Sequence, residues 1–379
     1  MKLPVIITLA VFVSGCARHE YSISVANDLD FDRNGEIVEM DASEIMAGYG
    51  KEFIISDNSG KEIPWQVTHD GKLIFPVDIK ANSTSEYSIS KGQPADIAAV
   101  TECIFRPDCQ DDIAWENENS GYRLYGPSFR ASGGKVYGYD IWSKCVTHPI
   151  VNKLYDDDHK RGISYHVDHG EGFDGYTVGP TLGGGMCAPV DSAGNLCYPC
   201  AYRTYEILDN GPLRVKVRFE IDPVSVDNDS VTETRVITLD SGSWLNKTDI
   251  AYSGADKSFP VAMGIVVHSD NHKFTISENN DYVSYSDLSD NVKAGNGEIY
   301  VGVLAAETDS AGFRPFPETI ANAIGETVIY GKYRPGSNIT YYWGSAWSKA
   351  NVKSEKEWNN ILDREAQKIK SPLKVKIMK

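Results

Sequence analysis

Two long stretches alternate apolar side chains with charged or polar ones almost without interruption. They are residues 212–221 (PLRVKVRFEI) and 231–239 (VTETRVITL), and Asp227-Asn228-Asp229 lies between them. A period of two is typical of a β-strand with one buried face and one solvent-facing face. Because Asp and Asn favour turns, these stretches predict a long antiparallel hairpin.

Shorter segments of the same kind occupy much of the chain, which predicts an all-β fold. We expect a small N-terminal β-sandwich over residues 17–95, a linker near residues 91–96, and a large antiparallel, supersandwich-like catalytic domain over residues 100–379. One helix is expected near the C-terminus, at residues 354–369, where apolar residues recur at helical spacing. The strand segments are residues 21–25, 53–57, 72–77, 86–90, 261–268, 273–276, 299–305 and 341–343.

The first sixteen residues, MKLPVIITLAVFVSGC, predict export from the cytoplasm. Lys2 precedes an apolar run that is too short to span a bilayer, as in a signal peptide. Small residues precede Cys16, as a lipoprotein signal peptidase requires. We therefore expect residues 1–16 to be a lipoprotein signal peptide, with a lipid on Cys16 as the sole membrane contact. This would place the protein in the periplasm or at the outer-membrane face. An ordinary signal peptide with a chance cysteine is the alternative.

The charge of the chain bears on its partners. Lys and Arg number 37 against 53 Asp and Glu, which gives a formal net charge of −16. A strongly acidic chain is a poor partner for nucleic acid. An acidic sugar would need a local concentration of Arg, Lys or His in the cleft that binds it. No oligomeric state follows from the sequence.

Six cysteines follow Cys16, and an even number in an oxidising compartment favours disulfides. A Cys103–Cys109 bond would close a small loop. Cys187 could pair with Cys197 or Cys200, leaving the other for Cys145. The alternative is a metal site, since Cys197-x-x-Cys200 has a spacing found in zinc sites.

The densest group of ionisable residues lies in the segment YHVDHGEGFDGY, residues 165–176. One interpretation is a divalent-metal site formed by His166, His169 and Glu171 or Asp174, although no strong zinc motif is present. A second is acid–base chemistry, with either histidine as the base and Tyr165 or Tyr176 as the proton donor. A third is a polar loop that satisfies its own backbone.

Aromatic and basic residues are interleaved in two further segments. In YRLYGPSF, residues 122–129, Arg123 and Tyr125 are expected to share one face of a strand, and YGYDIW, residues 137–142, follows. Aromatic rings stack on sugars and Arg pairs with carboxylates, so these segments suit a sugar site. The other segment, YYWGSAWSK, contains Trp347 and Lys349, and Lys349 could complete an anion site. Core packing is the alternative for each Trp.

At these residues the sequence resembles a bacterial domain-of-unknown-function family from polysaccharide-utilisation loci. The resemblance implies an oligosaccharide dehydratase, which removes water across C4–C5 of a non-reducing-end uronic acid. The segment between Cys187 and Cys200 departs from the family pattern. The resemblance rests on DDIAWEN (111–117), YRLYGPSF (122–129), YGYDIW (137–142), YHVDHGEGFDGYTVGPTLGGG (165–185), ILDNGPLRVKVRFEI (207–221), ETRVITLDSGSWLN (233–246) and YYWGSAWSKA (341–350).

Such an elimination needs a cation at the uronate carboxylate, a base at C5 and an acid at O4. Arg123, Lys349 or a bound metal could be the cation, His166 or His169 the base, and Tyr176 or Tyr125 the acid. Polysaccharide lyases use the same groups. A glycoside hydrolase using Glu171 with Asp174 or Glu116, and a non-catalytic glycan-binding lipoprotein, are the alternatives. The residues expected to bind substrate are Tyr139, Trp142, Glu171, Asp174, Trp347 and Lys349.

Overall fold

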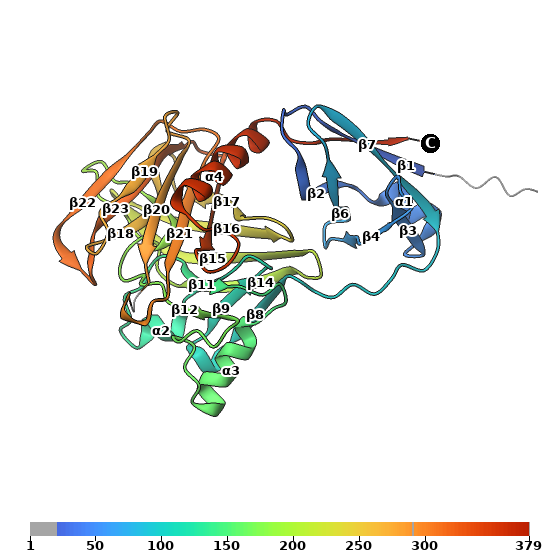
Figure 1. Ribbon diagram of the computed structural model, residues 1–379. Helices are drawn as coiled ribbons and strands as arrows, with labels where there is room; N and C mark the ends of the chain where they lie inside the picture. The colour runs from blue at the N-terminus through green and yellow to red at the C-terminus, as the bar shows by residue number, and fades with distance from the viewer. Residues whose placement is uncertain (1–20, 290–291, 379) are drawn as a thin grey trace, which may run out of the picture.

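The computed structural model describes residues 21–289 and 292–378 and is built mainly from antiparallel strands (Figure 1). The expected all-β class is therefore confirmed. The expected signal peptide and Cys16 lie outside the described residues. Among the residues described, none of the helices has the length and apolar character needed to cross a bilayer.

The N-terminal unit is a pair of facing sheets with its own apolar core. Alternation in its first strand buries Ile23 and Val25, which pack with Phe53, Phe75 and Tyr87. The first sheet runs in the order β25 (Lys374–Met378), β1 (Tyr21–Asn27), β7 (Ser83–Lys91), β3 (Phe53–Ser56), β4 (Glu62–Ile63). The second sheet runs β2 (Arg33–Asp41), β6 (Lys72–Ile79), β5 (Gln66–Val67), and the unit also contains the short helix α1 (Ser43–Tyr49).

The last strand of the chain belongs to this N-terminal unit. β25 pairs antiparallel with β1, and Val375 lies opposite Val25. Both ends of the described chain therefore meet in one sheet (Figure 1). The division at residues 95–100 stays a prediction.

The large unit is a sandwich around the main apolar core. The expected hairpin is confirmed, since β15 and β16 pair along both strands with one register shift between Ile221 and Val224, and Val215 lies opposite Leu239. One layer is an eight-stranded sheet, in the order β14 (Tyr202–Asn210), β15 (Arg214–Val226), β16 (Asp229–Asp240), β17 (Leu245–Ser253), β24 (Asn338–Trp347), β21 (Glu298–Leu304), β20 (Tyr282–Leu288), β19 (Phe274–Ile276).

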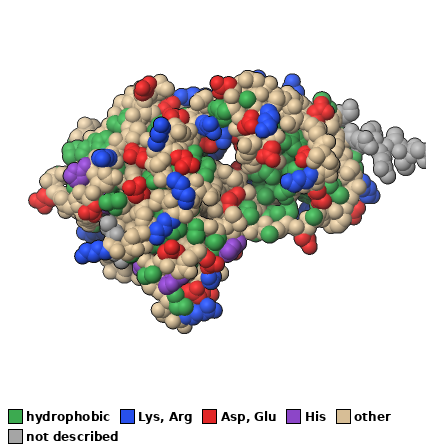
Figure 2. All heavy atoms as spheres, viewed as in Figure 1, with side chains coloured by type: hydrophobic (Ala, Val, Ile, Leu, Met, Phe, Trp, Pro, Cys, Tyr) green, Lys and Arg blue, Asp and Glu red, His purple; other side chains and the backbone are tan. Residues whose placement is uncertain are grey.

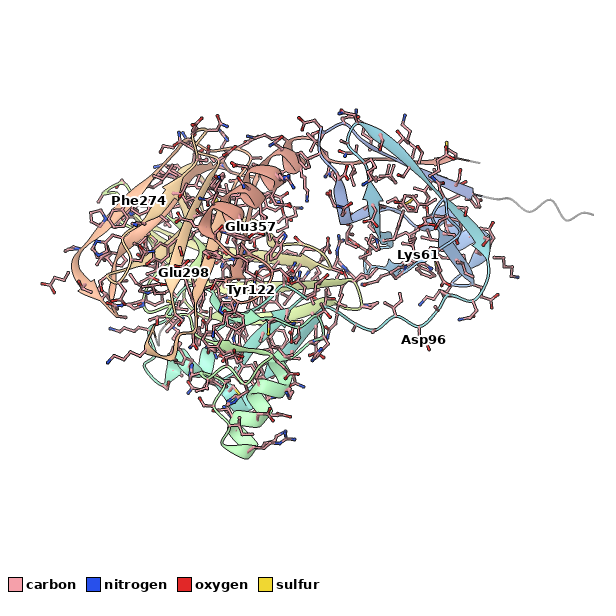
Figure 3. The ribbon with its side chains drawn as sticks, viewed as in Figure 1. Lys61, Asp96, Tyr122, Phe274, Glu298 and Glu357 are labelled. Atoms are coloured by element: carbon pink, nitrogen blue, oxygen red, sulfur yellow. The ribbon has the colours of Figure 1, made fainter. Side chains whose placement is uncertain are left out.

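Two smaller sheets form the other layer of the sandwich. Tyr122, labelled in Figure 3, joins the layers because its hydroxyl accepts a hydrogen bond from the Ser345 backbone N–H at 3.2 Å. The first sheet runs β13 (Gly184–Pro189), β18 (Phe259–His268), β23 (Ala323–Tyr333), β22 (Ser310–Ile320). The second runs β12 (Gly172–Asp174), β11 (Asp140–Lys144), β10 (Ser120–Leu124), β9 (Asp112–Glu116), β8 (Glu102–Arg106).

The expected C-terminal helix is α4 (Glu355–Lys370), and it covers the outer face of the eight-stranded sheet. It begins after Ser354, whose hydroxyl caps it by accepting a hydrogen bond from the Glu357 backbone N–H. Leu362 packs so closely on the sheet that a Cβ at Gly302 would lie 2.7 Å from it. A glycine at position 302 therefore permits this contact.

A second long helix, α3 (Val151–Arg161), was not predicted from the sequence. Its buried side chains are Val151, Leu154, Tyr155 and Asp157, and it lies at the lower end of the molecule in Figure 1. Its polar composition conceals the short apolar stripe that packs on the five-stranded sheet. The short helical segments are α2 (Pro127–Ala131), η1 (Pro107–Cys109) and η2 (Val292–Ala294).

The expected disulfides are absent: the six cysteines of the described chain are all free thiols. Cys103 belongs to the main core, whereas Cys109 packs beneath α3 on the opposite side of the five-stranded sheet. A disulfide needs Cα atoms within about 7 Å and Cβ atoms that face each other, so a sheet between them prevents the bond. Cys187 is buried in the core beside the Tyr252 hydroxyl, and Cys145 is exposed.

The two units meet around a cavity of about 320 Å³ that is lined with charged residues from both. Arg214 crosses the junction and pairs with Glu39 of β2 and Asp240 of β16. Figure 2 shows the hollow between the N-terminal unit and the rest of the molecule, and acidic and basic side chains intermingle around it. Ion pairs therefore cross the junction, and apolar side chains also line it.

Candidate active site

The five-stranded sheet has one apolar face and one charged face. Residues directly opposite each other on paired antiparallel strands share a face. Arg123 of β10 lies opposite Asp140 of β11, and Trp142 of β11 lies opposite Asp174 of β12. The residues that alternate with these along each strand point to the main core. Alternation alone therefore places the Arg123 guanidinium and the carboxylates of Asp140 and Asp174 on one face of the sheet. Helix α3 covers that surface.

Arg123 is the centre of this charged face. One of its terminal nitrogens donates to Asp140, to Asp174 at 2.8 Å and to the Tyr125 hydroxyl at 2.9 Å. Its guanidinium also lies 4.6 Å from the centroid of the Tyr125 ring and 5.2 Å from that of Trp142. Burial alone would lower the pKa of Arg123, but the neighbouring carboxylates hold it well above its usual value. The guanidinium is therefore permanently charged, and two aspartates already pair with it, although its buried Nε has no hydrogen-bond partner in the described chain.

A third carboxylate, Asp112 of β9, borders the same cluster. Its Oδ2 lies 3.8 Å from an Arg123 nitrogen and accepts a 3.3 Å hydrogen bond from the Tyr155 hydroxyl of α3. Burial raises the pKa of Asp112 to about 6, although Arg123 opposes that shift. With Asp140 and Asp174 paired to one guanidinium and Asp112 beside it, the cluster has more carboxyl groups than cations. Because Nη2 is engaged by the aspartates and Nε is buried, Arg123 does not offer an exposed fork to a uronate.

His166 lies at the solvent boundary of the cluster. Its side chain is 54% exposed, and its Nδ1 lies 3.0 Å from the backbone oxygen of Asp174 and 3.9 Å from the carboxylate of that residue. Tyr165 beside it packs on Trp142, with ring centroids 5.0 Å apart. The expected proximity of His166 to Asp174 and Tyr165 is therefore present. His166 is thus an exposed imidazole beside the buried charges.

A second group of polar residues lies deeper, beyond the end of β12. Tyr176 and His268 are both buried, and their ring centroids are 6.3 Å apart. His268 Nδ1 is 3.1 Å from Asp287 Oδ1. Neither the Tyr176 hydroxyl nor His268 Nε2 has a hydrogen-bond partner within the described part of the chain. Buried polar atoms are nearly always paired, so two unpaired ones on adjacent rings mark a candidate site.

The electrostatics of this pair differ between its members. Burial raises the pKa of Tyr176 well above 10, and Asp287, Tyr285 and Asp140 raise it further. The phenol is therefore protonated at neutral pH and can act as a proton donor. A carboxylate at Nδ1 favours the tautomer with a proton there, which leaves Nε2 of His268 as an acceptor. The pair thus combines an acid and a base.

These residues gather at one rim of the sandwich. His268 is the last residue of β18 and Trp347 is the last residue of β24. Asp287 lies opposite Ile299, and Ile299 lies opposite Trp347, across three neighbouring strands. Phe173 of β12 packs on Trp347 at 5.3 Å between ring centroids. Because strand ends from both layers meet here, the rim brings Tyr176, which follows β12, close to His268.

Of the other expected site residues, the structure buries Tyr139, Trp142 and Trp347 and leaves Lys349 exposed next to Trp347 at the rim. Tyr139 is fully buried, stacks on Trp343 at 3.9 Å and bonds to Arg235, and Trp142 is also fully buried. Lys349 is exposed, with its ammonium 5.8 Å from the centre of the Trp347 ring. Trp347 itself is buried, and its indole nitrogen donates to the Asn296 backbone oxygen at 2.7 Å.

The three residues of the expected metal site do not converge. His166 bonds to the Asp174 backbone, His169 Nε2 lies 3.1 Å from the Ser164 backbone oxygen, and Glu171 pairs with Lys153. Those contacts satisfy each side chain locally. Within residues 21–289 and 292–378, the group whose geometry suits a metal ion is a different one, Asp108, Cys109 and His159.

Sequence reasoning missed Asp140, His268 and Asp287. Asp140 could have been found, because it alternates with Trp142 in a strand and must share its face. His268 and Asp287 carry no such signal. They lie about 90 and 110 residues after Tyr176, and only the packing of two sheets brings them to the same rim.

Comparison with known proteins identifies the family. A family model described as "Domain of unknown function (DUF4861)" matches residues 25–375. The chain belongs to this family. As a DUF4861 member it is 25% identical to "Uncharacterized protein P7" of Formosa agariphila over an alignment of 397 positions, which covers 98% of each chain.

Solved structures resemble this DUF4861 chain in fold. An alpha-mannosidase from Enterococcus faecalis V583 gives a TM-score of 0.50 with 9% identity, covering 95% of this chain and 46% of that one. A protein of the Glycosyl Hydrolase Family 38 from Enterococcus faecalis gives 0.48 with 9% identity and covers 95% and 47%. The chain therefore spans just under half the length of these proteins.

Proposed function

We propose that this DUF4861 protein is a carbohydrate-active enzyme that removes water across C4–C5 of a non-reducing-end uronic acid in oligosaccharides. The observation that carries the proposal is the pair of buried, unpaired atoms on Tyr176 and His268. An elimination needs one proton acceptor and one proton donor, and this pair supplies both. The fold likeness to a protein titled an alpha-mannosidase makes carbohydrates the substrate class to test first.

The proposed reaction assigns each proton to a named atom. His268 Nε2 takes the proton from C5, whose acidity comes from the adjacent carboxyl group. The C5–H electrons form the C4–C5 double bond as the C4–O4 bond breaks. The Tyr176 hydroxyl donates its proton to O4, which leaves as water, and solvent then resets both residues. Asp287 keeps His268 oriented and stabilises its protonated form.

The uronate carboxylate requires a cation that is not already paired. Lys349 fits this role best, because it follows Trp347 at the rim and is exposed. Placing positive charge where an enolate develops is usually the largest contribution to such catalysis. Arg123, Asp140 and Asp174 would instead form a fixed group of charges beside Tyr176. A sugar reaches the two buried rings only if the rim opens to admit it.

The geometry favours elimination over hydrolysis by paired carboxylates. A glycoside hydrolase places its sugar between two carboxyl groups that are roughly 5 to 9.5 Å apart. Of the carboxylates considered for hydrolysis, Glu171 pairs with Lys153, Glu116 is buried against Lys144, and Asp174 pairs with Arg123. We also propose that a lipid on Cys16 anchors the protein outside the cytoplasm, where it would meet imported oligosaccharides.

Incubation with oligosaccharides that end in glucuronate or iduronate tests the proposal. Mass spectrometry should show the loss of one water, with ultraviolet absorbance of a conjugated enoate and no new reducing end. His268→Gln should lower the rate by about 10² to 10⁴-fold, the range for loss of a general base. His148→Ala, at an exposed histidine beside Glu171, should leave it unchanged. A gain of one water, or saturable binding without a product, would overturn the proposal.

A further inference from the structure

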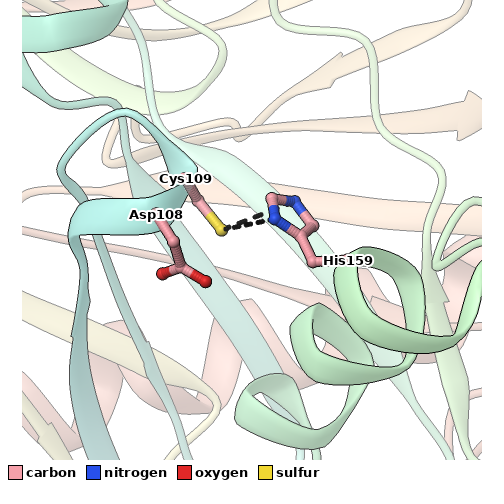
Figure 4. A group of neighbouring side chains, drawn as sticks. All are labelled: Asp108, Cys109 and His159. Atoms are coloured by element: carbon pink, nitrogen blue, oxygen red, sulfur yellow. Dashed lines mark hydrogen bonds between the residues drawn. The ribbon is translucent and has the colours of Figure 1, made fainter.

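A group of metal-ligating side chains lies apart from the candidate active site, where η1 meets the C-terminal half of α3. Asp108, Cys109 and His159 present one carboxylate oxygen, one thiol and one imidazole nitrogen within 4.8 Å of one another (Figure 4). Cys109 is buried, whereas Asp108 and His159 are exposed. An ion could therefore enter from solvent and be held against the protein.

The separation of these atoms matches zinc coordination. A Zn²⁺ ion bonded at about 2.3 Å to sulfur and about 2.0 Å to nitrogen, at a tetrahedral angle, sets those atoms about 3.5 Å apart. Cys109 Sγ lies 3.6 Å from His159 Nε2 and 3.8 Å from Nδ1. Because both ring nitrogens lie at nearly the same distance from the sulfur, the imidazole would turn until one nitrogen points at the ion. A thiol, an imidazole and a carboxylate are also the ligand types that zinc prefers.

The charges of the site balance when the ion is divalent. Zn²⁺ binding displaces the thiol proton to solvent, so Cys109 and Asp108 contribute two negative charges against two positive ones. Arg106 already donates to both oxygens of Asp108, at 3.0 and 2.7 Å, but each oxygen keeps a further lone pair. Arg106 itself remains paired with Asp156 at 2.8 Å. Lys160 also pairs with Asp156, and the Asp158 carboxylate, 3.9 Å from His159 Nε2, offsets that added positive charge.

We propose that Asp108, Cys109 and His159 form a Zn²⁺ site that fastens α3 to the five-stranded sheet, with water in the fourth position. Glu116 already holds the other end of the helix by accepting from the backbone N–H groups of Ile150 and Val151. Tyr155, one turn before His159, reaches Asp112 beside Arg123. The ion would thus hold helix α3 in place over the charged face of the five-stranded sheet.

Metal titration of the full chain tests this site. After treatment with a chelator, the protein should take up one Zn²⁺ per chain and gain thermal stability. Co²⁺ in place of Zn²⁺ should produce the near-ultraviolet charge-transfer absorbance of a thiolate ligand. His159→Gln, at an exposed helix position that tolerates substitution, should weaken binding by more than about 10-fold. Cys109→Ser should abolish the thiolate band.

Two control variants make the result specific. Cys145→Ser removes an exposed cysteine elsewhere and should leave the affinity and the absorbance unchanged. Cys197→Ser removes one sulfur of the CxxC spacing and should also have no effect. The proposal is overturned if Zn²⁺ binding survives His159→Gln and Cys109→Ser unchanged, if Cys197→Ser abolishes it, or if the chain takes up no Zn²⁺.

Discussion

At the scale of single residues, Tyr176 offers a test that separates a catalytic role from a structural one. Its buried hydroxyl lacks a partner in the described chain, and an unpaired buried polar group costs about 1 kcal/mol or more. Tyr176→Phe should therefore raise the free energy of unfolding by about 1 kcal/mol while it abolishes dehydration. Denaturant unfolding and mass spectrometry of the products measure the two effects.

Tyr122→Phe is the matched control, because the Tyr122 hydroxyl does accept a hydrogen bond. This substitution should lower the free energy of unfolding by about 1 kcal/mol. Equal destabilisation by the two substitutions would show that the Tyr176 hydroxyl is paired and structural.

Glu326 gives a pH dependence of stability. It is fully buried, accepts hydrogen bonds from the Leu182 backbone N–H and the Tyr198 hydroxyl, and burial raises its pKa from 4.5 to about 7. The folded protein thus binds this proton where the unfolded chain has lost it. The contribution of Glu326 to stability is fully present below pH 4.5 and falls by roughly 3 kcal/mol as pH rises to about 7.

Glu326→Gln keeps the shape of the side chain and removes its titration. The variant should match the parent protein near pH 4 and exceed its free energy of unfolding near pH 8. Urea unfolding at both pH values provides the comparison. The prediction is wrong if the difference between variant and parent is the same at both.

At the scale of elements, α3 depends on a buried ion pair. Lys144 of β11 pairs with Glu116 of β9, and both side chains are almost completely buried. Lys144→Met would leave the Glu116 carboxylate buried without its cation, so the free energy of unfolding should fall by roughly 3 to 5 kcal/mol. Lys160→Met removes an exposed pair with Asp156 and should cost less than about 1 kcal/mol. If chemical denaturation showed that Lys144→Met and Lys160→Met lower the free energy of unfolding by similar amounts, this account would be wrong.

The strands were more predictable than the elements that cover them. The hairpin of β15 and β16 follows from alternation, and α4 follows from apolar residues at helical spacing with Ser354 before them. Helix α3 was missed because its sequence is mostly polar and the apolar stripe that it buries is short. The contact between Arg123 and Tyr125 was predictable because it is local: the two residues alternate within one short segment. The link from Tyr176 to His268 depends on packing between sheets, which a single sequence does not encode locally.

At the scale of the whole molecule, the pairing of β25 with β1 ties the end of the chain to its start. Deleting residues from position 374 onward should expose one edge of β1 and speed amide hydrogen exchange in β1 and β7. Exchange in β15 and β16 should not change, because their hydrogen bonds lie in another sheet. Hydrogen-exchange mass spectrometry resolves both regions.

Lys376→Ser keeps the backbone pairing of β25 and serves as the control, so it should leave exchange in β1 unchanged. Faster exchange throughout the molecule after the deletion would mean that the two units unfold together. Unchanged exchange in β1 would mean that β25 adds nothing to the sheet.

The pairing of β25 with β1 also determines when the N-terminal sheet can be completed during synthesis. β7 is complete at residue 91, but the strand that shields the other edge of β1 begins at residue 374, about 280 residues later. At about 5 to 20 residues per second, synthesis leaves that edge open for roughly 15 to 60 seconds. An open strand edge is a template for pairing with other chains. The nascent protein is therefore most vulnerable to aggregation at its N-terminal unit, which is synthesised first. A chaperone that covers β1 would help it most during that interval.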